Sequence, residues 1–262
     1  MTTSARPEAI RVIVTRPAAQ AATWVESLRA HGIDAVALPL IAIAAPADPE
    51  AVSKAWAGLA KRGLVVFVSP NAAERFFAQQ PEGSSWPRGV LAAAVGPSTG
   101  EALKRHGVAA SDIVEPAADA AQFDSESLWS QLAHRMPWCG TSVLVVRGDG
   151  GRDWLADTLR DQGAKVDFVA AYRRQAPEFD GCALALLGEA SAHPRQCLWF
   201  FSSSQAIDHL AGARPAADWS ASHALATHPR IAERARALGF GSVQETRPGL
   251  ADVVACIQSR AS

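Results

Sequence analysis

The chain contains one sequence pattern that occurs twice. An arginine, a leucine and a glycine each recur 131 positions later, as the pairs Arg16 and Arg147, Leu28 and Leu159, and Gly32 and Gly163. At a nearly equal offset, Phe67-Val68-Ser69-Pro70-Asn71 returns as Phe200-Phe201-Ser202-Ser203-Ser204, and Pro97, Glu101 and Gly107 return as Pro229, Glu233 and Gly239. An offset that holds across separate blocks indicates two similar α/β units in one polypeptide. Two such units are expected to form a cleft, and clefts between domains are preferred places for ligands.

The length and charge of the chain limit what it can bind. Its 262 residues with 48% hydrophobic content allow one large domain or two modest ones, and the repeat favours two. The 25 basic and 26 acidic side chains give a formal net charge of −1, so no basic face indicates a nucleic-acid partner. If the ligand is an anion, local hydrogen-bond donors must hold it.

Neither the cysteines nor the histidines form a pattern typical of a metal site. The four cysteines, which lack CxxC spacing, are expected to be plain thiols that are buried or half-buried: Cys139, Cys182, Cys197 and Cys256. The seven histidines are single and dispersed, as surface residues would be. The polar start, Met1 to Glu8, has no apolar signal core, and no apolar run is long enough to cross a bilayer. We therefore expect a cytoplasmic protein without a metal or membrane partner.

Short apolar runs alternate with amphipathic segments, as in a parallel α/β fold. The expected strands cover Arg11 to Val14, Asp34 to Leu38, Leu64 to Val68, Val90 to Val95, Val143 to Val146, Val166 to Ala171, Cys197 to Phe201 and Ala224 to Ala226. Surface loops are expected at 190–195 and 212–220. Polar turns follow the strands, and their helices should direct free N–H groups towards the carboxyl end of the sheet, where ligands bind.

Most catalytic signatures are missing from the sequence. Gly148-Asp149-Gly150-Gly151-Arg152 lacks the Lys-Ser/Thr of a P-loop, and Asp153 replaces the third glycine of a dinucleotide motif. This turn either needs glycine backbone freedom or binds a carboxylate. No Ser-His-Asp, Cys-His or HExxH arrangement is present. The single tyrosine, Tyr172, follows an expected strand, and pattern alone favours a packing residue with its hydroxyl in water.

Taken in order, the blocks resemble the uroporphyrinogen-III synthase family. The resemblance runs nearly end to end through Val14-Thr15-Arg16-Pro17, Phe67 to Ala72, Ala94 to Thr99, Asp124-Ser125-Glu126, Val146-Arg147-Gly148 with Gly150-Gly151-Arg152, Val169 to Arg173, Phe200 to Ser204 and His228-Pro229-Arg230. The chain departs from many relatives at Thr227-His228-Pro229-Arg230, where they have a Gly-x-x-Thr turn like the one at Gly96.

The resemblance implies an α/β fold of two similar domains, each a parallel-sheet α/β sandwich, joined by a two-stranded linker with a cleft between them. Residues 1–38 plus 176–262 would form one discontinuous domain and residues 41–170 the other, with linkers near 39–40 and 171–175. Each domain would then draw elements from both copies of the repeat.

The resemblance also implies a reaction. Hydroxymethylbilane, a linear tetrapyrrole with eight carboxylates, would lose water and close into uroporphyrinogen III with ring D inverted. The enzyme would mainly hold one folded conformer, which needs no cofactor and no metal. Tyr172 matches the tyrosine proposed in the family to assist departure of the hydroxyl as a general acid. A monomer, in possible transient contact with the preceding bilane-forming enzyme, is expected.

The expected substrate-binding residues lie in the turns at strand ends. Those chosen for main-chain donors or hydroxyl groups are Thr15, Ser69, Asn71, Gly96, Ser98, Thr99, Ser125, Gly148, Gly150, Gly151, Ser202, Ser203, Ser204 and Thr227, with His228 beside them. Arg16, Arg147 and Arg152 could add positive charge or could pair within the protein. An alternative from another class stays open: a non-catalytic, two-lobed binding module for an anionic small molecule. A nucleotide-dependent transferase is disfavoured by the broken glycine motifs.

Overall fold

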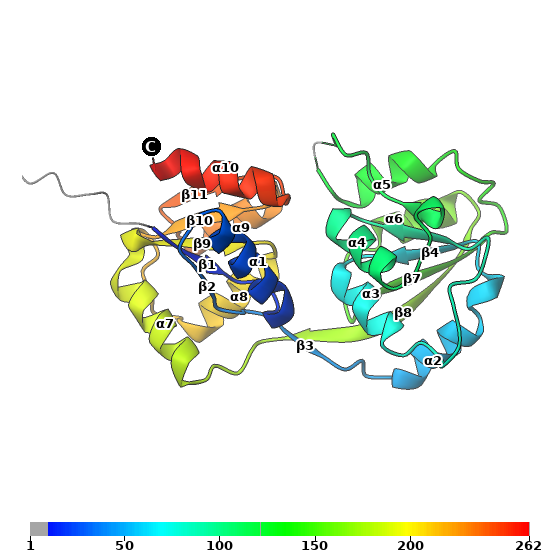
Figure 1. The fold of residues 1–262 in the computed structure, drawn as a ribbon, viewed down its shortest axis with the longest axis horizontal. Helices are drawn as coiled ribbons and strands as arrows, with labels where there is room; N and C mark the ends of the chain where they lie inside the picture. Colours follow the sequence, from blue (N-terminus) through cyan, green and yellow to red (C-terminus); the bar gives the residue numbers. More distant parts are fainter. Residues whose placement is uncertain (1–9, 121, 262) are drawn as a thin grey trace, which may run out of the picture. The chain divides into compact units, whose positions relative to one another are not determined.

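The computed structural model describes residues 10–120 and 122–261. Contacts divide the chain into two compact units, one made of Met1–Ala42 and Gln175–Ser262 and the other of Ile43–Arg174. Each unit has its own sheet, with strand order β11-β10-β9-β1-β2 in the first and β3-β8-β7-β4-β5-β6 in the second (Figure 1). The predicted α/β class with two parallel-dominated sheets is confirmed.

The first unit combines the two ends of the chain. Its strands are β1 (Arg11–Val14), β2 (Ala35–Ala37), β9 (Cys197–Phe201), β10 (His223–Ala226) and β11 (Ser242–Glu245). Its helices are α1 (Ala18–Ala30), α7 (Gly181–Ala192), α8 (Ser204–Ala213), α9 (Pro229–Leu238) and α10 (Leu250–Ala261). Each pair of neighbouring strands in this sheet is parallel, so the strands end on the same side of the unit.

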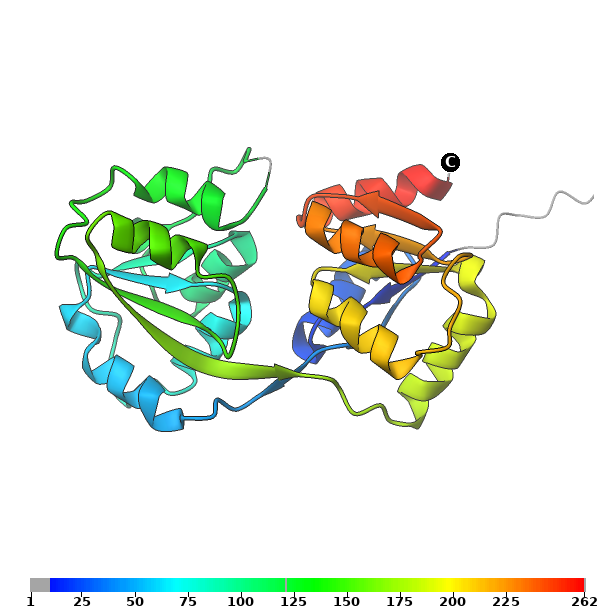
Figure 2. The same cartoon turned by 180° about the vertical axis from the view of Figure 1, so that it is seen from behind.

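Both faces of the first sheet are buried, as its continuous apolar strands predicted. Val25 and Leu28 of α1 pack with Val253 of α10 on one face, against alternate residues of β1 and β9. The next residues along β9, Trp199 and Phe201, point to the other face. There they form an aromatic cluster with Trp219 and Phe240, and Figure 2 shows α8 and α9, in yellow and orange, in front of that face.

The second unit is the continuous middle of the chain. Its strands are β3 (Ala42–Ala44), β4 (Leu64–Phe67), β5 (Leu91–Ala94), β6 (Ile113–Val114), β7 (Ser142–Gly148) and β8 (Lys165–Gln175). Its helices are α2 (Pro49–Ala57), α3 (Pro70–Phe77), α4 (Pro97–Arg105), α5 (Ser125–Leu132) and α6 (Trp154–Asp161). The neighbouring strands β3 and β8 carry the chain across the boundary between the units.

Two clusters fill the second unit, one on each face of its sheet. Residues of α2, α3 and α4 pack on one face, where Trp56 stacks on Phe76 with ring centroids 4.7 Å apart. Leu128 of α5 and Leu159 of α6 pack on the other. The single sheet with helices on both faces is the α/β sandwich that the family resemblance implied.

Several local expectations were wrong. Strand β8 continues to Gln175, so Tyr172 lies inside a strand and does not follow one. The segment 190–195, expected as a loop, contains the end of α7 and a 3-10 turn at Pro194–Gln196, and the segment 212–220 begins within α8. Cys139 and Cys182 are exposed, whereas Cys197 and Cys256 are buried and half-buried as expected.

The helices in the described residues lack the combination of length and apolar character that crossing a bilayer requires.

Candidate active site

The helices of the described residues differ in whether a carboxylate lies at their first turn. Five begin with neither an acidic cap nor an acidic first-turn residue: α1, α3, α4, α8 and α9. The other five begin with at least one such carboxylate: α2, α5, α6, α7 and α10. An internal carboxylate would offset the positive end of the helix dipole. The first group therefore keeps that positive end available to an external anion.

The first group lies in rows, one in each unit. Helices α3 and α4 follow the neighbouring parallel strands β4 and β5. Helices α9, α8 and α1 follow β10, β9 and β1, which are also neighbours and parallel. Parallel neighbours end side by side, so each sheet has a row of helix N-termini at its carboxyl end, where ligands of α/β sheets bind.

The predicted binding residues of the second unit lie at the starts of α3 and α4. Ser69 caps α3, because the N–H of Ala72 donates to its Oγ at 3.1 Å. Asn71 is half-buried in the first turn of α3. Gly96 is the cap residue of α4, where a Cβ would lie 3.3 Å from the Cβ of Phe123. Ser98, in the first turn of α4, is exposed, whereas Thr99 is buried.

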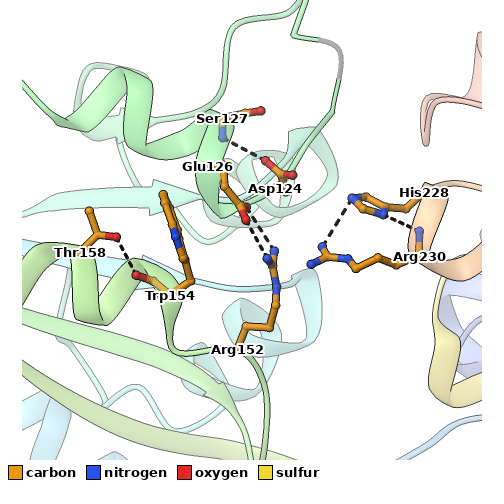
Figure 3. Close-up of polar contacts among 8 residues, drawn as sticks. All are labelled: Asp124, Glu126, Ser127, Arg152, Trp154, Thr158, His228 and Arg230. Carbon is orange, nitrogen blue, oxygen red and sulfur yellow. Dashed lines mark hydrogen bonds and ion pairs between the residues drawn. The ribbon is translucent and has the colours of Figure 1, made fainter.

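The predicted binding residues of the first unit lie at the starts of α8 and α9. Ser203 is the cap residue of α8, and Ser202, Ser203 and Ser204 are half-buried. His228 caps α9 through Nδ1, which accepts from the N–H of Arg230 at 3.2 Å (Figure 3), and Thr227 before it is buried. Thr15 is 1% exposed, and its hydroxyl donates to the carbonyl of Phe200 at 2.7 Å. Because that hydroxyl is bonded within the sheet, we leave Thr15 out of the proposed binding set.

Arg16 is the positive side chain at the end of β1. Its guanidinium lies over the ring of Trp24, 4.6 Å from the centroid, and 5.6 Å from that of Phe200. Its Nε is buried and has no hydrogen-bond partner among the described residues. Burial lowers the pKa of Arg16 to about 10, so the group is still charged at neutral pH. A buried cationic donor without a full set of acceptors favours binding of an anion.

Arg147 and Arg152 are instead paired within the second unit. Arg147 forms an ion pair with Asp153 and lies over the ring of Phe168, 4.3 Å from its centroid. Arg152 donates to both oxygens of Glu126 at 2.7 and 3.2 Å (Figure 3). The hydrogen bond from Arg152 lowers the pKa of Glu126.

The glycine turn between β7 and α6 fits a structural role better than carboxylate binding. Gly150 and Gly151 are exposed, and Gly151 has a φ of +145°, which favours glycine. Helix α6 then begins with Asp153 as its cap and has Asp157 in its first turn. Nearby, Ser125 opens α5, whose cap Asp124 accepts from the N–H of Ser127 at 2.9 Å. We therefore leave Gly150, Gly151 and Ser125 out of the binding set, together with the two paired arginines.

The side chain of Tyr172 is fully buried in the core of the second unit, with 0% exposure. Its hydroxyl lies 3.0 Å from Ser69 Oγ and 3.0 Å from Nη2 of Arg174. The packing role expected from pattern is therefore confirmed, but the expectation of a hydroxyl in water was wrong. The sequence analysis did not identify Arg174 as a partner of Tyr172. The alternation of side chains along a strand could have indicated it, because residues two positions apart share a face.

A register shift places Tyr172 in this position. Along β7 and β8, Arg147 pairs with Ala170, but the next residue, Gly148, pairs with Tyr172, so Ala171 is an extra residue. Such a bulge re-aims the side chains that follow it. Both Ala171 and Tyr172 are consequently buried in the same cluster. The ring of Tyr172 occupies the space above Gly148, where a Cβ would lie 3.1 Å from Cε2 and Cζ.

Glu115, which the sequence reasoning also missed, packs after β6 against Gly100 of α4. Its Oε1 is buried without a hydrogen-bond partner among the described residues, and burial raises the pKa of its carboxyl group. A raised folded-state pKa means that stability is lost as the pH rises through that pKa. We expect Glu115→Gln to raise Tm at pH 7 and to have little effect below about pH 3, where the carboxyl is protonated in both states. Thermal unfolding of both proteins across this pH range measures the difference, and an equal difference at all pH values would contradict this reasoning.

Within the described ranges, no group of three or more His, Cys, Asp or Glu side chains could hold a metal ion.

Comparisons with known proteins agree on one family. The family model described as "Uroporphyrinogen-III synthase HemD" matches residues 22–255. The chain is 34% identical over 176 residues to uroporphyrinogen-III synthase of Salmonella typhimurium, covering 67% of this chain and 69% of that protein. It is 28% identical over 242 residues to the Escherichia coli enzyme, covering 89% and 93%.

Solved structures show the same fold. A mutant uroporphyrinogen III synthase of Thermus thermophilus matches with a TM-score of 0.58 at 18% identity, covering 97% of this chain and 98% of that one. The Helicobacter pylori enzyme matches with a TM-score of 0.57 at 15% identity, covering 96% and 99%.

Proposed function

The chain belongs to the uroporphyrinogen-III synthase family, and we propose that the two rows of helix N-termini hold the carboxylates of its substrate. The protein converts hydroxymethylbilane to uroporphyrinogen III, with loss of water and inversion of ring D. The substrate has eight carboxylates, whereas the chain has a formal net charge of −1. Attraction by overall charge therefore cannot hold it, and directed local donors must.

The observation that carries this proposal is the set of five helices that begin without a carboxylate. Helices α3 and α4 would bind carboxylates through N–H groups of their first turns, with the hydroxyl of Ser98 beside them. Helices α1 and α8 would do the same, with Ser203, Ser204 and Arg16 beside them. Helix α9 would contribute its dipole instead, because the N–H groups of Arg230 and Ile231 already donate to His228. Hydrogen bonds from several N–H groups to a carboxylate are charge-assisted and stronger than neutral ones.

Holding the substrate in this way would select the reacting conformer. Unassisted closure of the linear tetrapyrrole does not invert ring D, so the enzyme must bring the substituted carbon of that ring to the site of attack. Placing the two reacting carbons together needs fixed contacts along the substrate and no strong nucleophile. Tyr172 would supply the proton that the hydroxyl needs to leave as water.

The direct test of the reaction is the isomer formed. We expect the purified protein, given freshly made hydroxymethylbilane, to yield the type III isomer, measured by chromatography after oxidation to porphyrin. An anion-binding module without catalysis would bind the substrate but give only the type I isomer that forms without an enzyme.

We further propose that the protein works in the cytoplasm as a monomer and receives hydroxymethylbilane from the preceding enzyme, either free or through transient contact. Size-exclusion chromatography with light scattering tests the monomer. Direct transfer is tested by a coupled reaction of the two enzymes in the presence of an added protein that captures free hydroxymethylbilane. A free intermediate is captured by that protein, whereas a directly transferred one is protected.

A further inference from the structure

The burial of Tyr172 raises a question about how its proton reaches the substrate. The side chain is 0% exposed, and its hydroxyl is covered by Ser69 and Arg174. Ser69 is half-buried and caps α3 at the carboxyl end of the sheet, where the substrate is proposed to bind. In this conformation, Ser69 is the partly exposed residue of the pair and Tyr172 the buried one.

The hydrogen bonds around Tyr172 have defined directions. Arginine can only donate, so Nη2 of Arg174 donates to the phenol oxygen at 3.0 Å. A buried hydroxyl needs an acceptor for its own hydrogen, and Ser69 Oγ, 3.0 Å away, is the acceptor in contact. The N–H of Ala72 also donates to Ser69 Oγ, at 3.1 Å. With these two bonds accepted, the hydroxyl hydrogen of Ser69 points away from both donors and can reach a ligand.

We propose that Ser69 delivers the proton to the departing hydroxyl of the substrate, that Tyr172 replaces it, and that Arg174 stabilises the resulting phenolate. This inference rests on the proposed function. Ser69 is then the catalytic residue that touches the substrate, whereas Tyr172 is the proton source behind it and Arg174 a positioning residue. The guanidinium carbon of Arg174 also lies over the Tyr172 ring, 5.6 Å from its centroid, so its positive charge faces the ring as well as the hydroxyl.

The proton transfers balance without another reactant. The carbon–oxygen bond of the terminal hydroxymethyl group breaks, and its electron pair leaves on the oxygen. That oxygen takes the proton of Ser69 and departs as water, Ser69 Oγ takes the proton of Tyr172, and the phenolate remains beside Arg174. The carbon that lost the hydroxyl forms a bond to the substituted carbon of ring D, and the older bond from that ring carbon to its methylene bridge breaks. The freed bridge carbon then bonds to the unsubstituted α-carbon of ring D, which releases one proton that returns through Ser69 to Tyr172.

The test must separate proton delivery from the capping role of Ser69. Ser69→Gly removes the hydroxyl, and glycine at a cap position lowers helix stability only slightly. Ser69→Thr keeps both the cap and a hydroxyl. We expect Ser69→Gly to lower kcat about 100-fold, in the range for lost acid catalysis, with KM changed less than threefold. Ser69→Thr should restore most of the kcat that Ser69→Gly loses, because threonine keeps a hydroxyl at this position.

The relay also predicts how the variants combine. Tyr172→Phe should lower kcat to a similar extent, and Ser69→Gly with Tyr172→Phe should be no slower than either alone, because groups that act as a unit are not additive. Arg174→Met should lower kcat about tenfold. Ser130→Ala, an exposed serine of α5, serves as the control with unchanged kcat.

The outcomes distinguish the relay from the reaction itself. If Ser69→Gly retains the kcat of the unmodified protein while Tyr172→Phe is slow, Tyr172 acts directly and the relay is wrong. Multiplying losses in the double variant would also overturn it. If the unmodified protein forms no type III isomer, the proposed function fails instead.

Discussion

Adding one carboxylate to the start of α4 and one to the start of α8 is expected to raise KM for hydroxymethylbilane about 100-fold without lowering Tm. The substitutions are Ser98→Asp and Gln205→Glu, each at the second residue of its helix. A carboxylate in the first turn stabilises a helix by about 0.3–1 kcal/mol. The same charge repels a bound carboxylate, and a tenfold loss at each helix corresponds to only about 1.4 kcal/mol. Steady-state kinetics and thermal unfolding of the single and double variants measure the two effects.

The matched control is Lys165→Gln. This exposed lysine begins β8, at the amino end of the parallel sheet, and its replacement changes the net charge by the same amount as each added carboxylate. We expect KM to be unchanged in this variant. A similar rise in KM for the control would indicate an effect of overall charge, and an unchanged KM in Ser98→Asp and Gln205→Glu would exclude both helix starts as carboxylate sites.

Gly148→Ala is expected to destabilise the protein by about 1–3 kcal/mol and to lower kcat about tenfold. The new Cβ would lie 3.1 Å from two ring atoms of Tyr172, and two hydrogen bonds hold the hydroxyl of that ring. The ring can therefore yield only by weakening its bonds to Ser69 and Arg174. The stability loss is that of an overpacked core. Chemical denaturation and steady-state kinetics measure both effects.

Gly150→Ala provides the stability control for that change. A Cβ there would have no heavy atom within 4 Å, so its stability should be equal or slightly higher. Leucine is shorter than tyrosine, so in a Tyr172→Leu variant the new Cβ has no ring to meet. Gly148→Ala should therefore lower the free energy of unfolding by less in that variant than in the unmodified protein. An undiminished loss in that background would show that the penalty comes from the backbone and not from the tyrosine ring.

The sequence predicted the fold well where apolar strands decide it. The continuous runs at Leu64 to Val68 and Cys197 to Phe201 became the buried centres of their sheets, β4 and β9. Strand β11 (Ser242–Glu245) was missed, because it contains one apolar residue and lies at the edge of its sheet. The interleaved course of the chain was accessible only through the family resemblance, since a repeat does not specify which copies share a sheet.

The candidate site was less accessible, because it depends on contacts between residues far apart in the chain. A bulge at Ala171 decides the direction of Tyr172, and no local pattern marks it. Arg147 and Arg152 are paired with Asp153 and Glu126, which decides that they do not serve as carboxylate-binding groups. Glu126 lies 26 residues from Arg152 in the sequence, so local pattern does not reveal this pair. In contrast, once the bounds of the helices are known, the sequence itself shows which helices begin with a carboxylate.

The central claim is that main-chain donors at the helix N-termini fix the substrate in the conformer that inverts ring D. The most direct measurement is the ratio of type III to type I isomer formed from fresh hydroxymethylbilane by the unmodified protein and by the variant with Ser98→Asp and Gln205→Glu. At substrate concentrations below KM, we predict type III as the main product of the unmodified protein and a large shift towards type I in the variant. Equal isomer ratios and equal rates in the two proteins would contradict the account.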